Sequence, residues 1–129
     1  MIHARLFYHV ILCTYKRQRF ITPKVEPSLH RLMREEFHEQ GASFCYLNGV
    51  TDHIHVLLSL GAHTRVSEVI EHVKTRSKAF MKCHDAGFLW QSGYAVLSVN
   101  PYDHKRLLNY ICDQKQRHAR DRLWLKHEW

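Results

Sequence analysis

Two histidines separated by one apolar residue form the chain's strongest candidate for chemistry. His53 and His55 flank Ile54 within an apolar run that predicts a β-strand. Side chains two residues apart in a strand project from the same face, so both imidazoles point one way and the apolar stripe points into a core. Neutral imidazole is the commonest protein metal ligand. The pair therefore indicates two ligands of a metal site; the simpler interpretation is two partly buried, hydrogen-bonded histidines.

A second pattern lies in the last predicted helix, where Tyr110 and Gln114 are four residues apart and share one helix face. If this helix crosses the sheet face that carries the histidines, Gln114 can offer a carbonyl oxygen to the same ion and Tyr110 lies beside it. Tyrosine, with a pKa of about 10, is a weak nucleophile that a divalent ion can assist by polarising a phosphate oxygen. These residues suit phosphodiester cleavage and rejoining through a phosphotyrosine ester. Such a site favours Mg²⁺ or Mn²⁺, although two imidazoles also accept Zn²⁺.

The first half of the chain predicts the elements that position the histidines. Residues 4–15 are rich in aromatic and β-branched types and predict a long central strand. Pro23 and Pro27 bracket the start of a helix that is expected to run to about Gln40. Residues 43–50 predict a second strand, which a turn at Asn48–Gly49 or Thr51–Asp52 joins to the histidine strand as an antiparallel hairpin.

The second half predicts a helix over residues 66–80 with Ser67 as its N-cap. Residues 88–91 and 94–99 predict two further strands, and Pro101 is expected to open the last helix. The order β-α-β-β-α-β plus a C-terminal helix predicts an α+β fold of the ferredoxin-like, RRM-like type, with two helices packed on one sheet face. The other face is then available for a site, with the histidine strand at its centre.

The composition is that of a small basic globular protein. With 129 residues and 45% hydrophobic content, the chain suits a single domain over residues 1–129 with a substantial core. Its 19 Lys and Arg against 12 Asp and Glu give a formal charge of +7, which favours an anionic partner such as nucleic acid. The four scattered cysteines form no CxxC pair, which argues against a zinc knuckle. The apolar settings of Cys13 and Cys45 predict buried free thiols. Without a signal sequence or a long apolar run, a cytoplasmic protein with no membrane partner is expected.

Basic residues along the chain suit contacts with nucleic-acid phosphates when they are taken together. Each of them alone is explained more simply as a solvated charge. The candidates for DNA binding are Lys16, Arg17, Arg19, Lys74, Arg76, Lys78, Lys105 and Arg106. Phe20, Tyr102 and Trp124 are candidate base-stacking partners.

The motifs of this chain, in their order, resemble those of single-tyrosine HUH transposases. This class contains the TnpA transposases of IS200-like insertion sequences and the REP-associated tyrosine transposases. His-x-His alone occurs often by chance, but the ordered set is specific and covers nearly the whole chain. The matching motifs are His53-Ile54-His55, Trp90-Gln91-Ser92-Gly93-Tyr94, Ser98-Val99 and Tyr110-Ile111-Cys112-Asp113-Gln114, with Tyr8-His9-Val10, Thr14-Tyr15-Lys16 and Lys74-Thr75-Arg76-Ser77 also similar.

The resemblance implies a role for each residue of the candidate site. His53 and His55 match the metal-binding pair, and Gln114 matches the third metal ligand. Tyr110 matches the nucleophile that becomes linked to a DNA 5′ phosphate and releases a 3′ hydroxyl. Asp52, which precedes the pair, is expected at most to hydrogen-bond a metal-binding residue without binding the metal itself. Members often carry two adjacent histidines after the glutamine position, where this chain has Arg117-His118.

The resemblance also implies the substrate and the assembly. Such a transposase acts on single-stranded DNA, recognises hairpins near insertion-sequence ends and needs no small-molecule cofactor. It usually works as a homodimer, in which the tyrosine helix of one subunit can complete the site of the other. Whether the tyrosine acts in cis or in trans is left open.

Three other functions are compatible with parts of the same sequence. A domesticated relative, or a replication-type HUH nickase, would use the same residues without moving its own gene. A non-catalytic module that binds single-stranded DNA or RNA would share the RRM-like element order, but the first strand lacks the glycine-aromatic pattern of RNA-recognition domains. A zinc hydrolase is disfavoured because no evident carboxylate general base accompanies the histidines.

Overall fold

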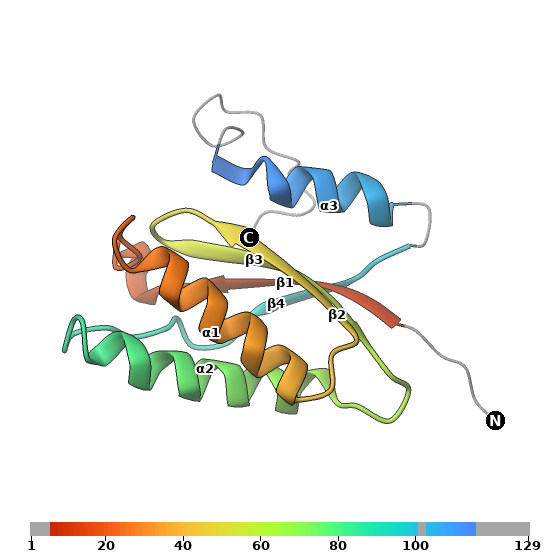
Figure 1. Cartoon of the computed structure of the whole chain (residues 1–129), viewed down its shortest axis with the longest axis horizontal. Coiled ribbons are helices and arrows are strands. Elements are labelled where there is room, and N and C mark those ends of the chain that lie inside the picture. Colours follow the sequence, from red (N-terminus) through yellow and green to blue (C-terminus); the bar gives the residue numbers. More distant parts are fainter. Residues whose placement is uncertain (1–5, 101–102, 116–129) are drawn as a thin grey trace.

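The computed structural model describes residues 6–100 and 103–115 of the chain (Figure 1). Its elements, in chain order, are β1 (Leu6–Cys13), the short 3-10 helix η1 (Tyr15–Arg17), α1 (Glu26–Glu39), β2 (Phe44–Gly49), β3 (His53–Leu60), α2 (Val66–Lys82), β4 (Ala95–Ser98) and α3 (His104–Cys112). The described strands form one antiparallel sheet in the order β2-β3-β1-β4. This topology confirms the predicted ferredoxin-like α+β fold and places β3 and β1 at its centre.

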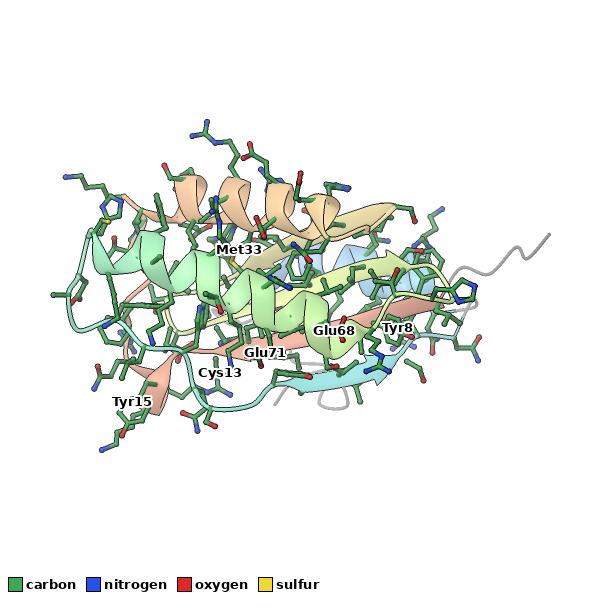
Figure 2. The ribbon with its side chains drawn as sticks, turned by 90° about the horizontal axis from the view of Figure 1, so that it is seen from below. Tyr8, Cys13, Tyr15, Met33, Glu68 and Glu71 are labelled. Atoms are coloured by element: carbon green, nitrogen blue, oxygen red, sulfur yellow. The ribbon has the colours of Figure 1, made fainter. Side chains whose placement is uncertain are left out.

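Helices cover both faces of the sheet (Figure 1). The side chains of β3 that face α1 and α2, such as Ile54 and Val56, belong to the main core together with Met33 and Phe37. Figure 2 shows the molecule from the side of these two helices, with Met33 labelled. On the opposite face, Leu57 packs with apolar side chains of α3. All eight residues of β3 are buried. The face that the sequence predicted to be open is therefore the face on which α3 lies.

The segment predicted as a strand over residues 88–91 is not one, and that prediction was wrong. A single bridge joins Thr14 to Trp90. Phe88 and Trp90 are buried in the core under the helices, and the Trp90 indole N–H donates to Ser77 Oγ at 3.0 Å. Two backbone hydrogen bonds flank the bridge, from the Tyr15 N–H to the Leu89 carbonyl and from the Gln91 N–H to the Cys13 carbonyl, so pairing with the chain after β1 is only local. The alternating apolar pattern here reflects two aromatic rings inserted into the core.

The predicted N-cap of the second helix was also wrong. The N-cap of α2 is Arg65 rather than Ser67, and no side chain caps this helix. Helix α3 ends at Cys112 with a turn at Asp113, after which Gln114 and Lys115 are again helical. Tyr110 and Gln114 are both buried. The predicted helix opening at Pro101 lies outside the described residues.

The four cysteines are free thiols, as the sequence predicted for Cys13 and Cys45. Cys13 is buried and Cys45 is half-buried, and burial raises the pKa of the Cys45 thiol to about 12. Cys45 is therefore protonated, and unreactive, at neutral pH. Among the residues that the structure describes, no helix is both long and apolar enough to span a bilayer.

The β2–β3 hairpin brings the histidines into register, and its turn lies at Thr51–Asp52. The Val50 N–H donates to the carbonyl of His53 at 3.0 Å, which closes the turn. At Gly49 a Cβ atom would collide with the carbonyl oxygen of His53 and stand 2.8 Å from Ile54 Cα. Backbone passes too close at this position for any side chain, so glycine is required.

Substituting Gly49 by alanine should therefore destabilise the fold by about 1–3 kcal/mol or more, because a backbone clash cannot be relieved by a rotamer change. Gly61→Ala is the matched control, since a Cβ there meets nothing within 4 Å. Urea unfolding of both variants measures the difference. Equal stability of the two variants would contradict the close approach at Gly49.

Candidate active site

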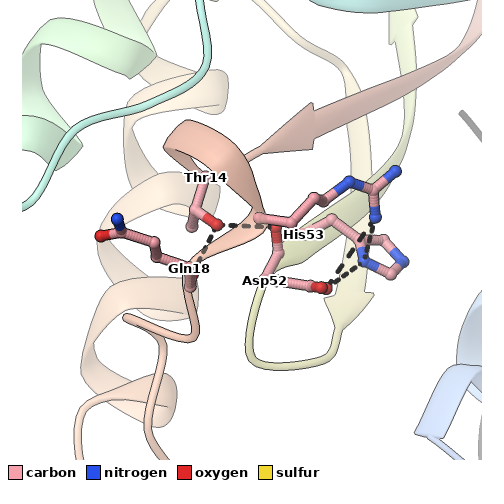
Figure 3. A network of polar contacts seen from close by, with 5 residues as sticks. Thr14, Gln18, Asp52 and His53 are labelled. Carbon is pink, nitrogen blue, oxygen red and sulfur yellow. Dashed lines mark hydrogen bonds and ion pairs between the residues drawn. The ribbon is translucent and has the colours of Figure 1, made fainter.

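The ring of His53 is fixed by two residues at its Nδ1 side (Figure 3). Its Nδ1 lies 2.7 Å from Asp52 Oδ1, while Arg17 Nη1 lies 3.3 Å from the same nitrogen and 3.9 Å from the carboxylate. A carboxylate only accepts, so Nδ1 carries the hydrogen and Arg17 acts as the charge partner of Asp52. The lone pair of the ring is then on Nε2, which is the nitrogen that this histidine would offer to a metal.

Residues that follow β1 brace this end of the hairpin. The Thr14 N–H donates to the carbonyl of Asp52 at 2.9 Å, and its hydroxyl donates to the Gln18 carbonyl at 2.6 Å (Figure 3). Lys16 and Arg17 adopt left-handed backbone conformations, with φ of 53° and 55°. Non-glycine residues avoid this region, so the surrounding contacts must hold the pair in place. The strained bend is what carries the Arg17 guanidinium to Asp52.

His55 lies one step further along β3 and is fully buried. Its Nδ1 is 2.7 Å from Nε2 of His9, and the two rings stack with centroids 4.9 Å apart. The centroid of the His53 ring is 5.1 Å from that of His55. The structure therefore brings the two predicted imidazoles together on the sheet face that α3 covers.

Helix α3 places Tyr110 over this pair. The Tyr110 ring is buried, and its centroid lies 6.0 Å from that of His55, nearly perpendicular to it. Leu57 of β3 and Leu107 of α3 pack in the same cluster and fix the helix on the sheet. Gln114, just beyond the turn that ends α3, is also fully buried. A single chain thus supplies the histidine pair and the tyrosine next to it.

The donor atoms suit a hard divalent cation better than a closed zinc site. Within residues 6–100 and 103–115, no group of three or more His, Cys, Asp or Glu side chains could hold a metal. An ion on His53 and His55 would thus need oxygen ligands, from the Gln114 amide or from substrate. Mg²⁺ and Mn²⁺ accept such oxygen-rich, incomplete protein coordination, whereas structural zinc sites use four protein ligands. The residues present therefore fit the predicted metal.

Polar contacts anchor the C-terminal end of α3 to the rest of the protein. The Asn48 side-chain amide of β2 donates to the carbonyl of Cys112 at 3.1 Å. Lys115 donates to Asn48 Oδ1 at 2.9 Å and forms an ion pair with Glu26 of α1. These contacts join three elements at the point where the chain leaves Tyr110.

His30 lies beside this anchor and makes the fold sensitive to acid. Burial lowers its pKa from 6.5 to about 4; Glu26 opposes this shift, and Lys115 and Arg34 add to it. The unfolded chain then binds the proton more readily, so stability falls as pH decreases from about 6.5 towards 4, by up to about 3 kcal/mol. Urea unfolding at pH 7 and pH 4.5 should show a smaller loss for His30→Gln than for wild type. Exposed His63→Gln is the control, and equal losses in wild type and His30→Gln would contradict the assignment.

Comparison with known proteins decides the family. A family model described as "Transposase IS200 like" matches residues 3–114. The chain belongs to this family. The match confirms the resemblance seen in the ordered motifs. This IS200-like transposase is also similar to the ISDra2 transposase TnpA of Deinococcus radiodurans, with 24% identity over 118 residues that cover 85% of this chain and 84% of the relative.

Solved structures share the fold of this IS200-like transposase. A crystal structure of a protein from Deinococcus radiodurans R1 assigned as a transposase aligns with a TM-score of 0.71 and 23% identity, over 88% of this chain and 93% of the other. A REP-associated tyrosine transposase bound to a REP hairpin aligns with a TM-score of 0.68 and 14% identity, over 91% of this chain and 70% of the other. At these identities the likeness establishes the fold.

The predicted DNA-binding residues of this transposase fall into separate groups. Lys16 and Arg17 line a hollow of about 510 Å³ with Cys13 and Gln91. Lys78 lines a neighbouring hollow of about 370 Å³, which Gln91 also borders. Tyr15 lines the second hollow and Cys13 the first; both residues are labelled in Figure 2. This region adjoins His53, since Cys13 is its partner in the sheet register.

The other predicted basic contacts are less simply placed. Lys74 donates to the carbonyls of Gln91 and Gly93 at 3.0 and 3.1 Å, and burial lowers its pKa, so it braces a loop. Arg76 lies 3.8 Å from Glu36 in the helix layer, away from the histidine face. Arg19, Lys105 and Arg106 are exposed, the last two on α3. Phe20 packs against the core, while Tyr102 and Trp124 lie outside the described residues.

His9 is the site residue that was given no role from the sequence. Its only signal was its place in the Tyr8-His9-Val10 motif, whose spacing gives no reason to connect it with residue 55. The connection arises from the β1–β3 register, in which His9 faces Leu57 and Ile11 faces His55. His9 and His55 are therefore diagonal neighbours on one face of two paired strands.

Proposed function

We propose that this IS200-like transposase cleaves and rejoins single-stranded DNA through a 5′-phosphotyrosine at Tyr110, assisted by a divalent metal, Mg²⁺ or Mn²⁺. The observation that carries the proposal is the position of the Tyr110 ring over His55, whose own ring lies 5.1 Å from that of His53. Its substrate would be hairpins near insertion-sequence ends. The REP hairpin bound to the related REP-associated transposase supports this choice of substrate.

Each step of the proposed reaction uses a group of the chain. His53 and His55 would hold the metal through their Nε2 atoms, with the Gln114 amide oxygen as a third ligand. A divalent ion bound there would polarise a phosphate oxygen and stabilise the charge that develops on it. The Tyr110 oxygen would attack phosphorus and lose its proton, while the bond to the 3′ oxygen breaks and that oxygen gains a proton. The new ester keeps the bond energy, so a 3′ hydroxyl can reverse the step and reseal DNA.

The proposed assembly is a homodimer, as the resemblance implies. Tyr110 lies over the histidines of its own chain, and the anchor formed by Asn48, Glu26 and Lys115 holds α3 there. This arrangement favours cleavage in cis within each subunit. The same residues would serve a nickase that does not move its own gene, so strand transfer to a second DNA must be measured alongside cleavage.

The test is a cleavage assay with the whole protein and a single-stranded hairpin taken from DNA that flanks its gene. With Mn²⁺ present, DNA labelled at its 3′ end should become covalently attached to the protein, while the 5′-labelled fragment is released with a free 3′ hydroxyl. A scrambled strand without a hairpin and a reaction with EDTA are the controls. Hydrolysis without a protein adduct, or an adduct formed through a 3′ phosphate, would refute the proposal.

The hollows next to His53 predict where the strand runs. Replacing both Lys16 and Lys78 with glutamine should weaken binding to single-stranded DNA and reduce the slope of log affinity against log salt by about 0.7 for each lost phosphate contact. Arg76→Gln is the control, because Arg76 faces Glu36 in the helix layer. Fluorescence anisotropy over a range of salt concentrations measures the slopes. An equal loss in the Arg76 variant would mean that net charge, rather than this path, determines binding.

A further inference from the structure

His9 is a buried polar residue in the middle of the sheet face that carries the candidate site. It is 0% exposed, and its Nε2 lies 2.7 Å from Nδ1 of His55. The neighbouring position on this face of the sheet is Leu57, which packs in an apolar cluster. An imidazole at such a place costs free energy unless its nitrogens are hydrogen-bonded. The contact with His55 satisfies the Nε2 nitrogen and gives a histidine at position 9 a structural reason.

We propose that His9 is a positioning residue that selects the metal-binding tautomer of His55; this inference rests on the proposed function. Two neutral rings joined by one hydrogen bond allow two arrangements. If His55 Nδ1–H donates to His9 Nε2, the lone pair of His55 is on Nε2, where it can bind a metal. If His9 Nε2–H donates instead, His55 carries its hydrogen on Nε2 and cannot bind there.

The environment of His53 supports the first arrangement. There the acceptor is the Asp52 carboxylate, 2.7 Å from Nδ1, and it leaves Nε2 as the coordinating atom. His9 Nε2 stands at the same distance from the same atom of the other ring. Each imidazole of the pair thus has its own acceptor behind it, a carboxylate for His53 and an imidazole for His55. Such partners orient metal-binding histidines and make them better ligands.

The stacked geometry adds a second constraint. The rings of His9 and His55 are inclined by 22°, with centroids 4.9 Å apart, whereas His55 meets Tyr110 nearly edge-on at 80°. His9 therefore packs along one flank of the ring, and rotation of His55 would break both the stack and the hydrogen bond. The inference is that His9 fixes the orientation of His55 as well as its tautomer.

The test compares His9→Gln with His9→Leu in the full-length protein. The glutamine amide oxygen can accept from His55 Nδ1–H, whereas leucine fills the space without an acceptor. Binding of Mn²⁺, followed by the EPR signal of the free ion, should weaken about 10- to 100-fold in His9→Leu and return close to wild type in His9→Gln. His30→Leu is the control for a general loss of packing, because it also replaces a buried histidine, but on α1, which covers the other face of the sheet.

A spectroscopic measurement is independent of metal binding. Two-bond ¹H–¹⁵N correlations of the metal-free protein should place the hydrogen of His55 on Nδ1 in wild type and His9→Gln, and on Nε2 at least in part in His9→Leu. Wild-type spectra with the hydrogen of His55 on Nε2, or unchanged Mn²⁺ affinity in a folded His9→Leu variant, would overturn the proposal. Failure of the proposed function would look different, because wild type itself would then bind no Mn²⁺ and form no DNA adduct.

Discussion

Replacing Tyr110 with phenylalanine should abolish the covalent protein–DNA adduct and lower the cleavage rate by a factor of at least about 10⁴, as expected when a nucleophile is removed. The variant keeps the ring that packs with Leu57 and Leu107, so the fold and hairpin binding should persist. Only the hydroxyl is lost. Denaturing gels of labelled DNA measure the adduct, and anisotropy measures binding in the same samples.

Tyr46→Phe is the matched control for that experiment. Tyr46 lies on β2 opposite Leu57 and packs in the same cluster as Tyr110, so it is the neighbouring tyrosine on this face of the sheet. Its hydrogen bond with Cys112 raises its pKa to about 12, which makes it a poorer nucleophile. The adduct should survive in Tyr46→Phe. An undiminished adduct in Tyr110→Phe, or a modified peptide that contains another tyrosine, would contradict the assignment of Tyr110.

Replacing His55 with leucine should remove most of the affinity for Mn²⁺, because one of the two proposed nitrogen ligands is lost and only His53 remains. The metal concentration needed for adduct formation should rise by about 100-fold or more. Leucine is accommodated because apolar side chains already pack on this face. Isothermal titration with Mn²⁺ and the metal dependence of the adduct should shift together.

Exposed His84→Leu controls for the removal of a histidine as such. This variant should leave both the Mn²⁺ titration and the metal dependence of adduct formation unchanged. A His55→Leu protein that binds Mn²⁺ as wild type does, or that forms the adduct at the same metal concentration, would show that the histidine pair is only a buried, hydrogen-bonded pair. That simpler interpretation is the alternative that the sequence left open for this pair.

The sequence predicted those parts of the site that depend on local periodicity. His53 and His55 share a face because a strand repeats every two residues, and Ile54 needs the core on the other side. The ordered motifs then connected this strand with Tyr110, and in the structure the ring centroids of Tyr110 and His55 lie 6.0 Å apart. Strand periodicity and helix order are properties of the chain itself, so this much could be inferred before any coordinates.

The remaining features depend on tertiary contacts that local patterns do not encode. His9 reaches His55 through the register of two strands separated by 46 positions. Phe88 and Trp90 alternate like a strand but insert into the core. In each case packing between distant segments overrides a local preference.

Because β3 is buried on both sides, the length of the loop that precedes it sets the phase of the whole strand. A single inserted or deleted residue between Gly49 and His53 would exchange the two sets of side chains. Both imidazoles would then turn into the apolar layer under α1 and α2, and Ile54 would face Tyr110. Fold and chemistry would fail together, so we expect this loop to tolerate changes of residue type far better than changes of length.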